Sequence, residues 1–173
     1  TVEKFGSVDM FYANAGVESR VLTVADFDIN DFEKVFAVNV LSAFLGASAA
    51  MRQMATQPTR GKIVFTASIA GLKGDAGVGV YVASKHAVIG MSKSLMKEAG
   101  PQGIRVNVVA PGVVETRMMR PLEEGLAGLA GIDVETFKGA MSAAVPMGRY
   151  AEPEEIAATA AWLLSDEVPY MHG

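Results

Sequence analysis

The sequence contains no cysteine among its 173 residues. Disulfide bonds, thiolate nucleophiles and cysteine-ligated metals are therefore excluded. Histidine is almost as scarce: His86 and His172 are the only two, too few for a histidine-rich site, and we expect no bound metal. The chemistry of this chain has to come from hydroxyl, amide, carboxyl and amine groups.

A block of basic residues is also missing. The 15 Lys and Arg residues are outnumbered by 19 Asp and Glu residues, and the net charge is -4. The two signs are interspersed, which gives no electrostatic footprint for nucleic acid or for an anionic membrane surface. We expect a small-molecule partner that is neutral or mildly polar.

No targeting pattern is evident at the start of the sequence. Thr1–Gly6 carries two charges and no apolar core, so we expect a cytoplasmic protein. An uncharged stretch, Val35–Met51, falls slightly short of a membrane span and contains Asn39, Ser42 and Ser48. It is interpreted as a buried helix, and no membrane partner is expected.

Apolar residues, in contrast, make up 50% of the chain. That proportion is enough for one sizeable core, so we expect a single domain over residues 1–173. β-branched, apolar runs predict buried strands at 8–13, 62–68 and 104–109, and helical patterns occur at 31–57, 80–98 and 153–164. The alternation predicts an α/β fold with a doubly wound, Rossmann-like parallel sheet, followed by a less regular segment at 113–150.

Two side chains capable of acid/base chemistry lie four residues apart in the second predicted helix. At this spacing Tyr81 and Lys85 share one helix face. An ammonium group beside a phenol favours the phenolate, so Lys85 is expected to lower the pKa of Tyr81. By itself the pattern is weak, because chance produces it in roughly one such sequence in five, as a pair on the helix surface.

Further candidate residues lie where the predicted strands end. Parallel sheets present ligand-binding groups at this edge. Ser68 ends the second strand shortly before Tyr81, and its hydroxyl can donate to a carbonyl oxygen. Asn14 and Gly16 follow the first strand, and Pro111-Gly112 follows the third. The agreement between successive strand ends favours a functional site over unrelated surface residues.

With this order and spacing the sequence resembles the short-chain dehydrogenase/reductase family, in its single-domain branch, over about residues 8–164. Ser68, Tyr81 and Lys85 match the catalytic serine, tyrosine and lysine of that family. Asn39 matches the family's helix asparagine, although by itself it could be a packing residue with a satisfied amide. The resemblance assigns coenzyme contacts to Asn14, Ala15, Gly16, Tyr81, Lys85, Pro111, Gly112, Val114 and Thr116.

The resemblance implies an oxidoreductase that uses NAD or NADP to interconvert a secondary alcohol and a ketone by hydride transfer. Tyr81 would exchange a proton with the substrate oxygen, and Ser68 would orient that oxygen. Lys85 would lower the pKa of Tyr81 and bind the nicotinamide ribose. Asn39 would link Lys85 to solvent through a water molecule.

The family's glycine-rich phosphate-binding turn directly follows its first strand. No glycine cluster of this sequence follows a strand in that way. The resemblance therefore implies a partial chain, without on the order of 80 residues ahead of Thr1 and without the family's last strand beyond Gly173. The segment that chooses between NAD and NADP would be absent, and we expect such a chain to be poorly soluble and inactive alone.

The substrate is left open by the sequence. Met118, Met119, Leu122 and Met147 match the family's substrate-covering region and could line an apolar pocket. Methionine at helical spacing more often packs in a core, so each of these residues is weak evidence singly. Alicyclic secondary alcohols and 3-oxoacyl thioesters both remain candidates.

The helices that begin near Asp31 and Val80 carry more apolar surface than one sheet face can cover, which predicts a buried subunit interface. The resemblance implies a homo-oligomer formed through these helices, either a dimer or a tetramer. Two rival interpretations remain. One is the family's extended branch, which has a substantial additional C-terminal domain. The other is a non-catalytic nucleotide-binding regulator on the same fold, although the set of Asn39, Ser68, Tyr81 and Lys85 argues against it.

Overall fold

A three-stranded parallel sheet with the order β1-β2-β3 forms the centre of the computed structural model, which describes residues 1–173. The strands are β1 (Met10–Ala13), β2 (Gly61–Thr66) and β3 (Ile104–Val109). Ile63 pairs with Phe11 on one side and with Val106 on the other. Three successive residues of β2, Ile63 to Phe65, are fully buried, as expected for a parallel strand covered on both faces. The predicted α/β fold is confirmed.

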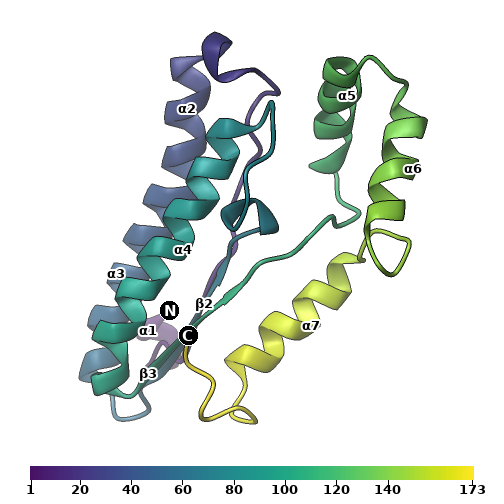
Figure 1. Cartoon of the computed structure of the whole chain (residues 1–173). Helices are drawn as coiled ribbons and strands as arrows, with labels where there is room; N and C mark the ends of the chain where they lie inside the picture. Colours follow the sequence, from purple (N-terminus) through teal and green to yellow (C-terminus); the bar gives the residue numbers. More distant parts are fainter.

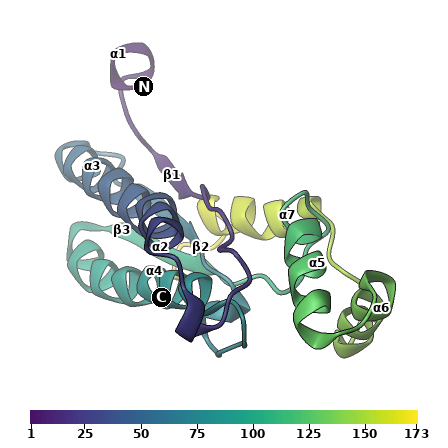
Figure 2. The same ribbon diagram turned by 90° about the horizontal axis from the view of Figure 1, so that it is seen from above.

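Helices cover both faces of this sheet (Figure 1, Figure 2). On one face, α2 (Ile29–Phe36), the π-helical turn η2 (Ala37–Leu41) and α3 (Ser42–Thr56) form one continuous helix that lies beside α4 (Gly79–Ala99). On the other face lies α7 (Pro153–Leu164), whose Ala160 and Leu163 pack with Val64 and Val109. The short elements are α1 (Val2–Phe5), η1 (Val24–Asp26), η3 (Ile69–Gly71) and η4 (Gly100–Gln102).

The helix starts follow from capping side chains. Asp28 caps α2 by accepting a hydrogen bond from the backbone N–H of Asn30, whereas Asp31 accepts from the N–H of Arg20 and completes no capping box. At α7, Glu152 and Glu155 form a reciprocal capping box around Pro153. The predicted start of α7 at Pro153 is therefore confirmed, and α2 begins two residues before its predicted start at 31.

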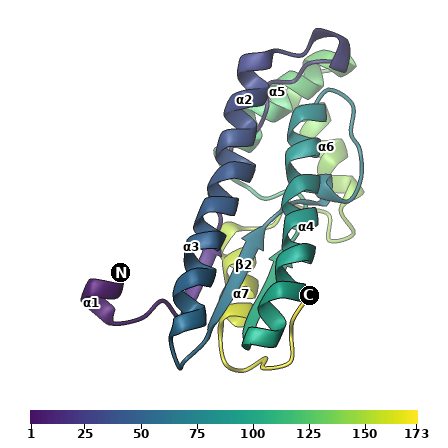
Figure 3. The same ribbon diagram turned by 90° about the vertical axis from the view of Figure 1, so that its left-hand side faces the viewer.

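The long helix over Ile29–Thr56 corrects one prediction. Its inner face packs in the core, where Val35 and Met54 are fully buried. Figure 3 shows this helix beside α4. Its outer face exposes Phe44 and Leu45, which are 55% and 62% accessible. The helix is long and apolar enough to cross a membrane by length and composition alone. The interpretation as a buried helix holds for one face and is wrong for the other.

The segment predicted to be less regular contains two helices, α5 (Met119–Ala130) and α6 (Val134–Ala144), which stand to one side of the sheet (Figure 2). Gly131 ends α5 in the left-handed region, at a φ of 69°. Gly125 allows close packing, because a Cβ atom there would lie 2.5 Å from Cγ2 of Val21. The glycines that made this segment look irregular therefore have packing and capping roles.

Candidate functional site

The carboxyl ends of the three strands meet at one edge of the sheet, as the sequence predicted. After β1, Asn14 places its side-chain oxygen 2.8 Å from the Thr66 hydroxyl at the end of β2. Beyond β2 and β3, the N–H of Ile69 donates to the carbonyl oxygen of Pro111 at 2.9 Å. Hydrogen bonds of the backbone or of the Thr66 side chain thus connect the segments that follow the three strands.

Ser68 follows β2 in an extended conformation and caps η3. Its Oγ accepts a hydrogen bond of 3.1 Å from the N–H of Ala70. This bond uses a lone pair and leaves the hydroxyl proton available to a neighbour. Ser68 is therefore a fixed hydroxyl donor at the edge of the sheet.

Tyr81 lies in the first turn of α4 and is largely withdrawn from solvent. Burial raises the pKa of its phenol, hydrogen bonding from Ser68 opposes this change, and the charge of Glu18 adds to it. Tyr81 therefore holds its proton firmly at neutral pH. A phenol in that state is suited to donate a proton to a substrate oxygen.

Lys85, one turn further along α4, is only 4% exposed. Its Nζ donates to the carbonyl oxygen of Thr66 at 3.1 Å and lies 5.5 Å from the centre of the Tyr81 ring. Burial lowers the pKa of Lys85 to about 8. The lowering of the Tyr81 pKa by Lys85 stays a prediction: in this structure the amine is bonded to Thr66, and burial is the main influence on the pKa of both groups.

Asn39 is 2% exposed and points inward from the π-helical turn η2. Its Oδ1 accepts from the N–H of Val17 at 2.8 Å, and its Nδ2 donates to the carbonyl oxygen of Val17 at 2.9 Å and to Ser84 Oγ at 3.0 Å. Both amide N–H donors are therefore occupied within the chain. The side chain holds the loop after β1 against α4, and the link from Lys85 to solvent through Asn39 stays a prediction.

The remaining predicted site residues lie between β3 and α5. Gly112 and Thr116 are exposed, and Val114 forms a short parallel bridge with Ala151. Met119 is buried and Met118 is half-buried near the start of α5, in keeping with a covering role. Leu122 is also half-buried, but Met147 is 75% exposed, so its assignment to the wall of a pocket is wrong.

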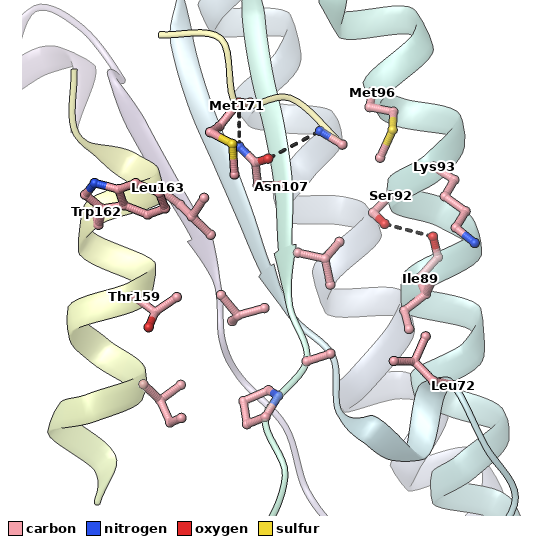
Figure 4. Close-up of a pocket in the computed structure, with 16 residues that line it drawn as sticks. Leu72, Ile89, Ser92, Lys93, Met96, Asn107, Thr159, Trp162, Leu163 and Met171 are labelled. Carbon is pink, nitrogen blue, oxygen red and sulfur yellow. Dashed lines mark hydrogen bonds between the residues drawn. The ribbon is translucent and has the colours of Figure 1, made fainter. Parts of the chain in front are cut away.

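A cavity of about 570 Å³ lies along β3 between α4 and α7 (Figure 4). Its walls are mainly apolar, with Ile89 and Met96 on α4 facing Trp162 and Leu163 on α7. At one end the N–H of Gly173 donates to the carbonyl oxygen of Val106. Ser68, Tyr81 and Lys85 do not line this cavity, and Pro111 is the one predicted site residue that does.

Two residues that contribute to the site were not predicted. Ser84 is fully buried, accepts from Asn39 and donates to the carbonyl oxygen of Tyr81 at 2.7 Å. Its position one helical turn after Tyr81 gave no signal of this role. The charge of Glu18 acts on Tyr81. Glu18 is the second residue after the Asn14-Ala15-Gly16 motif, and this position in the sequence was the available signal of its role.

Known proteins are similar to this chain in sequence and fold. The family model described as enoyl-(acyl carrier protein) reductase matches residues 1–173. Levodione reductase of Leifsonia aquatica is 35% identical over 175 residues, which cover 99% of this chain and 63% of that protein. Among solved structures, NAD⁺-bound xylitol dehydrogenase has a TM-score of 0.90 at 34% identity, with 99% of this chain and 67% of that one covered. ElxO with NADP bound has a TM-score of 0.84 at 26% identity, with 99% of this chain and 65% of that one covered.

The chain thus spans 63–67% of the length of these proteins. Within that span, the family model extends over every residue, and the fold and the order of the strand-end residues agree with the resemblance seen in the sequence. The chain belongs to the short-chain dehydrogenase/reductase family.

Proposed function

We propose that the protein is an NAD(P)-dependent oxidoreductase that interconverts a secondary alcohol and a ketone. The observation that carries this proposal is the convergence of a free hydroxyl donor (Ser68), a protonated phenol (Tyr81) and a buried amine (Lys85) at the carboxyl edge of a parallel sheet. The names of levodione reductase and xylitol dehydrogenase support the same reaction class.

The residues present fit a nicotinamide nucleotide. Lys85 Nζ uses one N–H on Thr66 and has two left for acceptors such as ribose hydroxyls. Space beside that amine depends on Gly16, because a Cβ atom there would lie 3.5 Å from Nζ and 3.4 Å from Asn39 Oδ1. NAD and NADP are both supported by the neighbouring structures, and either coenzyme would supply the hydride chemistry when bound.

The chain's own residues handle the proton. Ser68 donates to the substrate oxygen and holds it next to the Tyr81 hydroxyl. In reduction Tyr81 gives its proton to that oxygen, and in oxidation it takes the proton back. Lys85, as an ammonium below a pH of about 8, stabilises the phenolate that forms when Tyr81 has donated. Asn39 keeps the loop after β1 in place beside this pair.

A second candidate is a reductase of acyl thioesters on the same site. It is favoured by the description of the matching family model, which names an acyl carrier protein substrate. A panel that contains cyclic alcohols, cyclic ketones and 3-oxoacyl thioesters, assayed with both coenzymes, separates the two. Turnover of thioesters alone would favour the second candidate, and no turnover of any compound would favour a non-catalytic regulator.

Substitution of Ser68 by Ala in the intact protein tests the substrate role of this hydroxyl. We expect kcat/KM to fall by about 10²-fold, the cost of losing one donor to the reacting oxygen. The coenzyme Kd, measured by fluorescence titration, should change little, because Ser68 is not among the residues assigned to the coenzyme. A variant that loses coenzyme affinity but keeps its turnover at saturation would contradict the assignment.

We also propose that two copies of the chain associate through the outer faces of α3 and α4. A groove of about 510 Å³ runs between these helices and is lined by Phe44, Met51, Met91 and Leu95. Substitution of Phe44 by Arg places a charge in this exposed groove and should halve the mass measured by light scattering. Substitution of Ile132 by Arg, between α5 and α6, should leave the mass unchanged. Equal masses for both variants would contradict the proposal.

A further inference from the structure

Two serines of α4, Ser84 and Ser92, have the same local setting. Both side chains are fully buried. The Ser84 hydroxyl donates its proton to the backbone carbonyl oxygen of Tyr81, three residues earlier, at 2.7 Å. The Ser92 hydroxyl donates in the same way to Ile89 at 2.8 Å. A serine within a helix commonly makes such a bond, so this bond alone gives neither residue a function.

Ser84 differs from Ser92 in one further contact. Its oxygen accepts a hydrogen bond of 3.0 Å from Nδ2 of Asn39, which lies 45 residues earlier in the π-helical turn η2. The proton of the Ser84 hydroxyl is used on Tyr81, so the oxygen offers a lone pair to Asn39. Both bonds therefore have a fixed direction: Asn39 donates to Ser84, and Ser84 donates to Tyr81.

The other bonds of Asn39 extend this network to the loop after β1. Its Oδ1 accepts from the N–H of Val17 at 2.8 Å, and its Nδ2 also donates to the carbonyl oxygen of Val17 at 2.9 Å. A flipped amide would turn its oxygen toward that carbonyl oxygen, so these bonds fix the orientation of the side chain. A buried network with all its donors used holds its members in one arrangement. Ser84 is the point at which this network reaches α4.

The Ser84 link acts on the helix turn of Tyr81 more than on Lys85. It bonds the backbone of Tyr81 directly. Lys85 has anchors of its own, because its Nζ donates to the carbonyl oxygen of Thr66 at 3.1 Å. Its backbone carbonyl oxygen also lies so close to η3 that a Cβ atom at Gly71 would be 2.8 Å from it. Loss of the Ser84 link would therefore loosen the phenol more than the amine.

We propose that Ser84 is a positioning residue for the proton transfer, which acts through Asn39 to hold the turn of Tyr81 against the loop after β1. The phenol is thereby kept where the substrate oxygen receives its proton. A displacement of a reacting group by about 1 Å can cost as much as 10²-fold in rate. In this role Ser84 touches neither the substrate nor the coenzyme. This inference rests on the proposed function.

The test substitutes Ser84 by Ala in the intact protein, with Ser92→Ala as the matched control. Both changes remove a fully buried hydroxyl and its bond to a helix carbonyl, and Ser84→Ala also removes the acceptor of Asn39. We expect kcat to fall by about 10-fold in Ser84→Ala and to stay within about 2-fold of the wild type in Ser92→Ala. The rate is expressed per coenzyme-binding site, counted by fluorescence titration, so that unfolded molecules do not contribute.

The coenzyme Kd separates positioning from binding. It should stay within about 2-fold of the wild type in Ser84→Ala, because the anchors of Lys85 remain. A role in coenzyme binding would raise the Kd and leave kcat at saturation unchanged, and that result would overturn the inference. An equal fall of kcat in the two serine variants would also overturn it, because the bond to Asn39 would then have no separate effect.

A second background removes the proton whose donor Ser84 positions. In Tyr81→Phe the ring and the backbone remain, but there is no phenol proton to place. Addition of Ser84→Ala to Tyr81→Phe should lower the residual turnover by less than about 2-fold, against about 10-fold in the protein with Tyr81. A merely structural role would give the same factor in both backgrounds, and equal factors would overturn the inference.

Failure of this inference differs from failure of the proposed function. If the wild-type protein turns over alcohols and Ser84→Ala keeps its full kcat, the inference is overturned and the proposed function stands. If the wild-type protein shows no coenzyme-dependent turnover of any substrate, the proposed function is overturned and the inference with it.

Discussion

Substitution of Tyr81 by Phe in the intact protein is expected to lower kcat by about 10²–10⁴-fold, the contribution of a positioned general acid. The ring would remain in place against Lys85, whose Nζ lies 5.5 Å from its centre, so only the dissociable proton is removed. Coenzyme affinity and the free energy of unfolding should change little. The measurement is kcat under saturating coenzyme and substrate, in both reaction directions.

Tyr170→Phe is the control for this substitution, because the Tyr170 side chain is 98% exposed and far from any site residue in sequence. Its kcat should equal that of the wild type. Near wild-type turnover in Tyr81→Phe would show that another group supplies the proton.

Substitution of Lys85 by Met should make the fold more stable at pH 7. Burial lowers the pKa of Lys85 from 10.5 to about 8, so at neutral pH the folded state carries a penalty of about 3 kcal/mol for the buried charge. Loss of the hydrogen bond to Thr66 offsets about 1 kcal/mol. A net gain of about 2 kcal/mol is expected, together with a large loss of turnover.

The contribution of Lys85 to the free energy of unfolding depends on pH with a defined sign. Between pH 8 and 10.5 the unfolded chain binds more protons at Lys85 than the folded protein does, so this residue makes the free energy of unfolding rise with pH. The increase in the free energy of unfolding caused by Lys85→Met should therefore become smaller between pH 8 and pH 10.5. Urea denaturation at pH 7 and pH 10 measures this change. Lys97→Met, at an exposed position of the same helix, should show neither effect. A destabilised Lys85→Met at pH 7 would contradict the account.

The strands and the catalytic set could be predicted because their signals are local. β2 and β3 are rich in β-branched residues, and a strand of this kind is recognisable without knowledge of its neighbours. Tyr81 and Lys85 are one helical turn apart, so any helix brings them together. Ser68 follows a buried strand, and parallel sheets place such residues at one edge.

What could not be predicted depends on contacts between distant segments. The pKa of Tyr81 is set by burial, which arises only when the loop after β1 and η3 close around α4. The partner of Asn39 is the backbone of Val17, 22 residues earlier, and no local pattern identifies it. The bounds of helix α5 were not predicted, because its glycines lower helix propensity and the packing of Gly125 against Val21 is a tertiary contact.

Hydride transfer itself is tested most directly by isotope transfer. The intact protein is incubated with a secondary alcohol deuterated at its carbinol carbon and with oxidised coenzyme, and the reduced coenzyme is analysed by mass spectrometry. The account predicts that each reduced coenzyme carries one deuterium from the alcohol, and that Tyr81→Phe slows its appearance. Reduced coenzyme without deuterium, or none formed with any alcohol of the panel, would contradict the assignment of this site to an oxidoreductase.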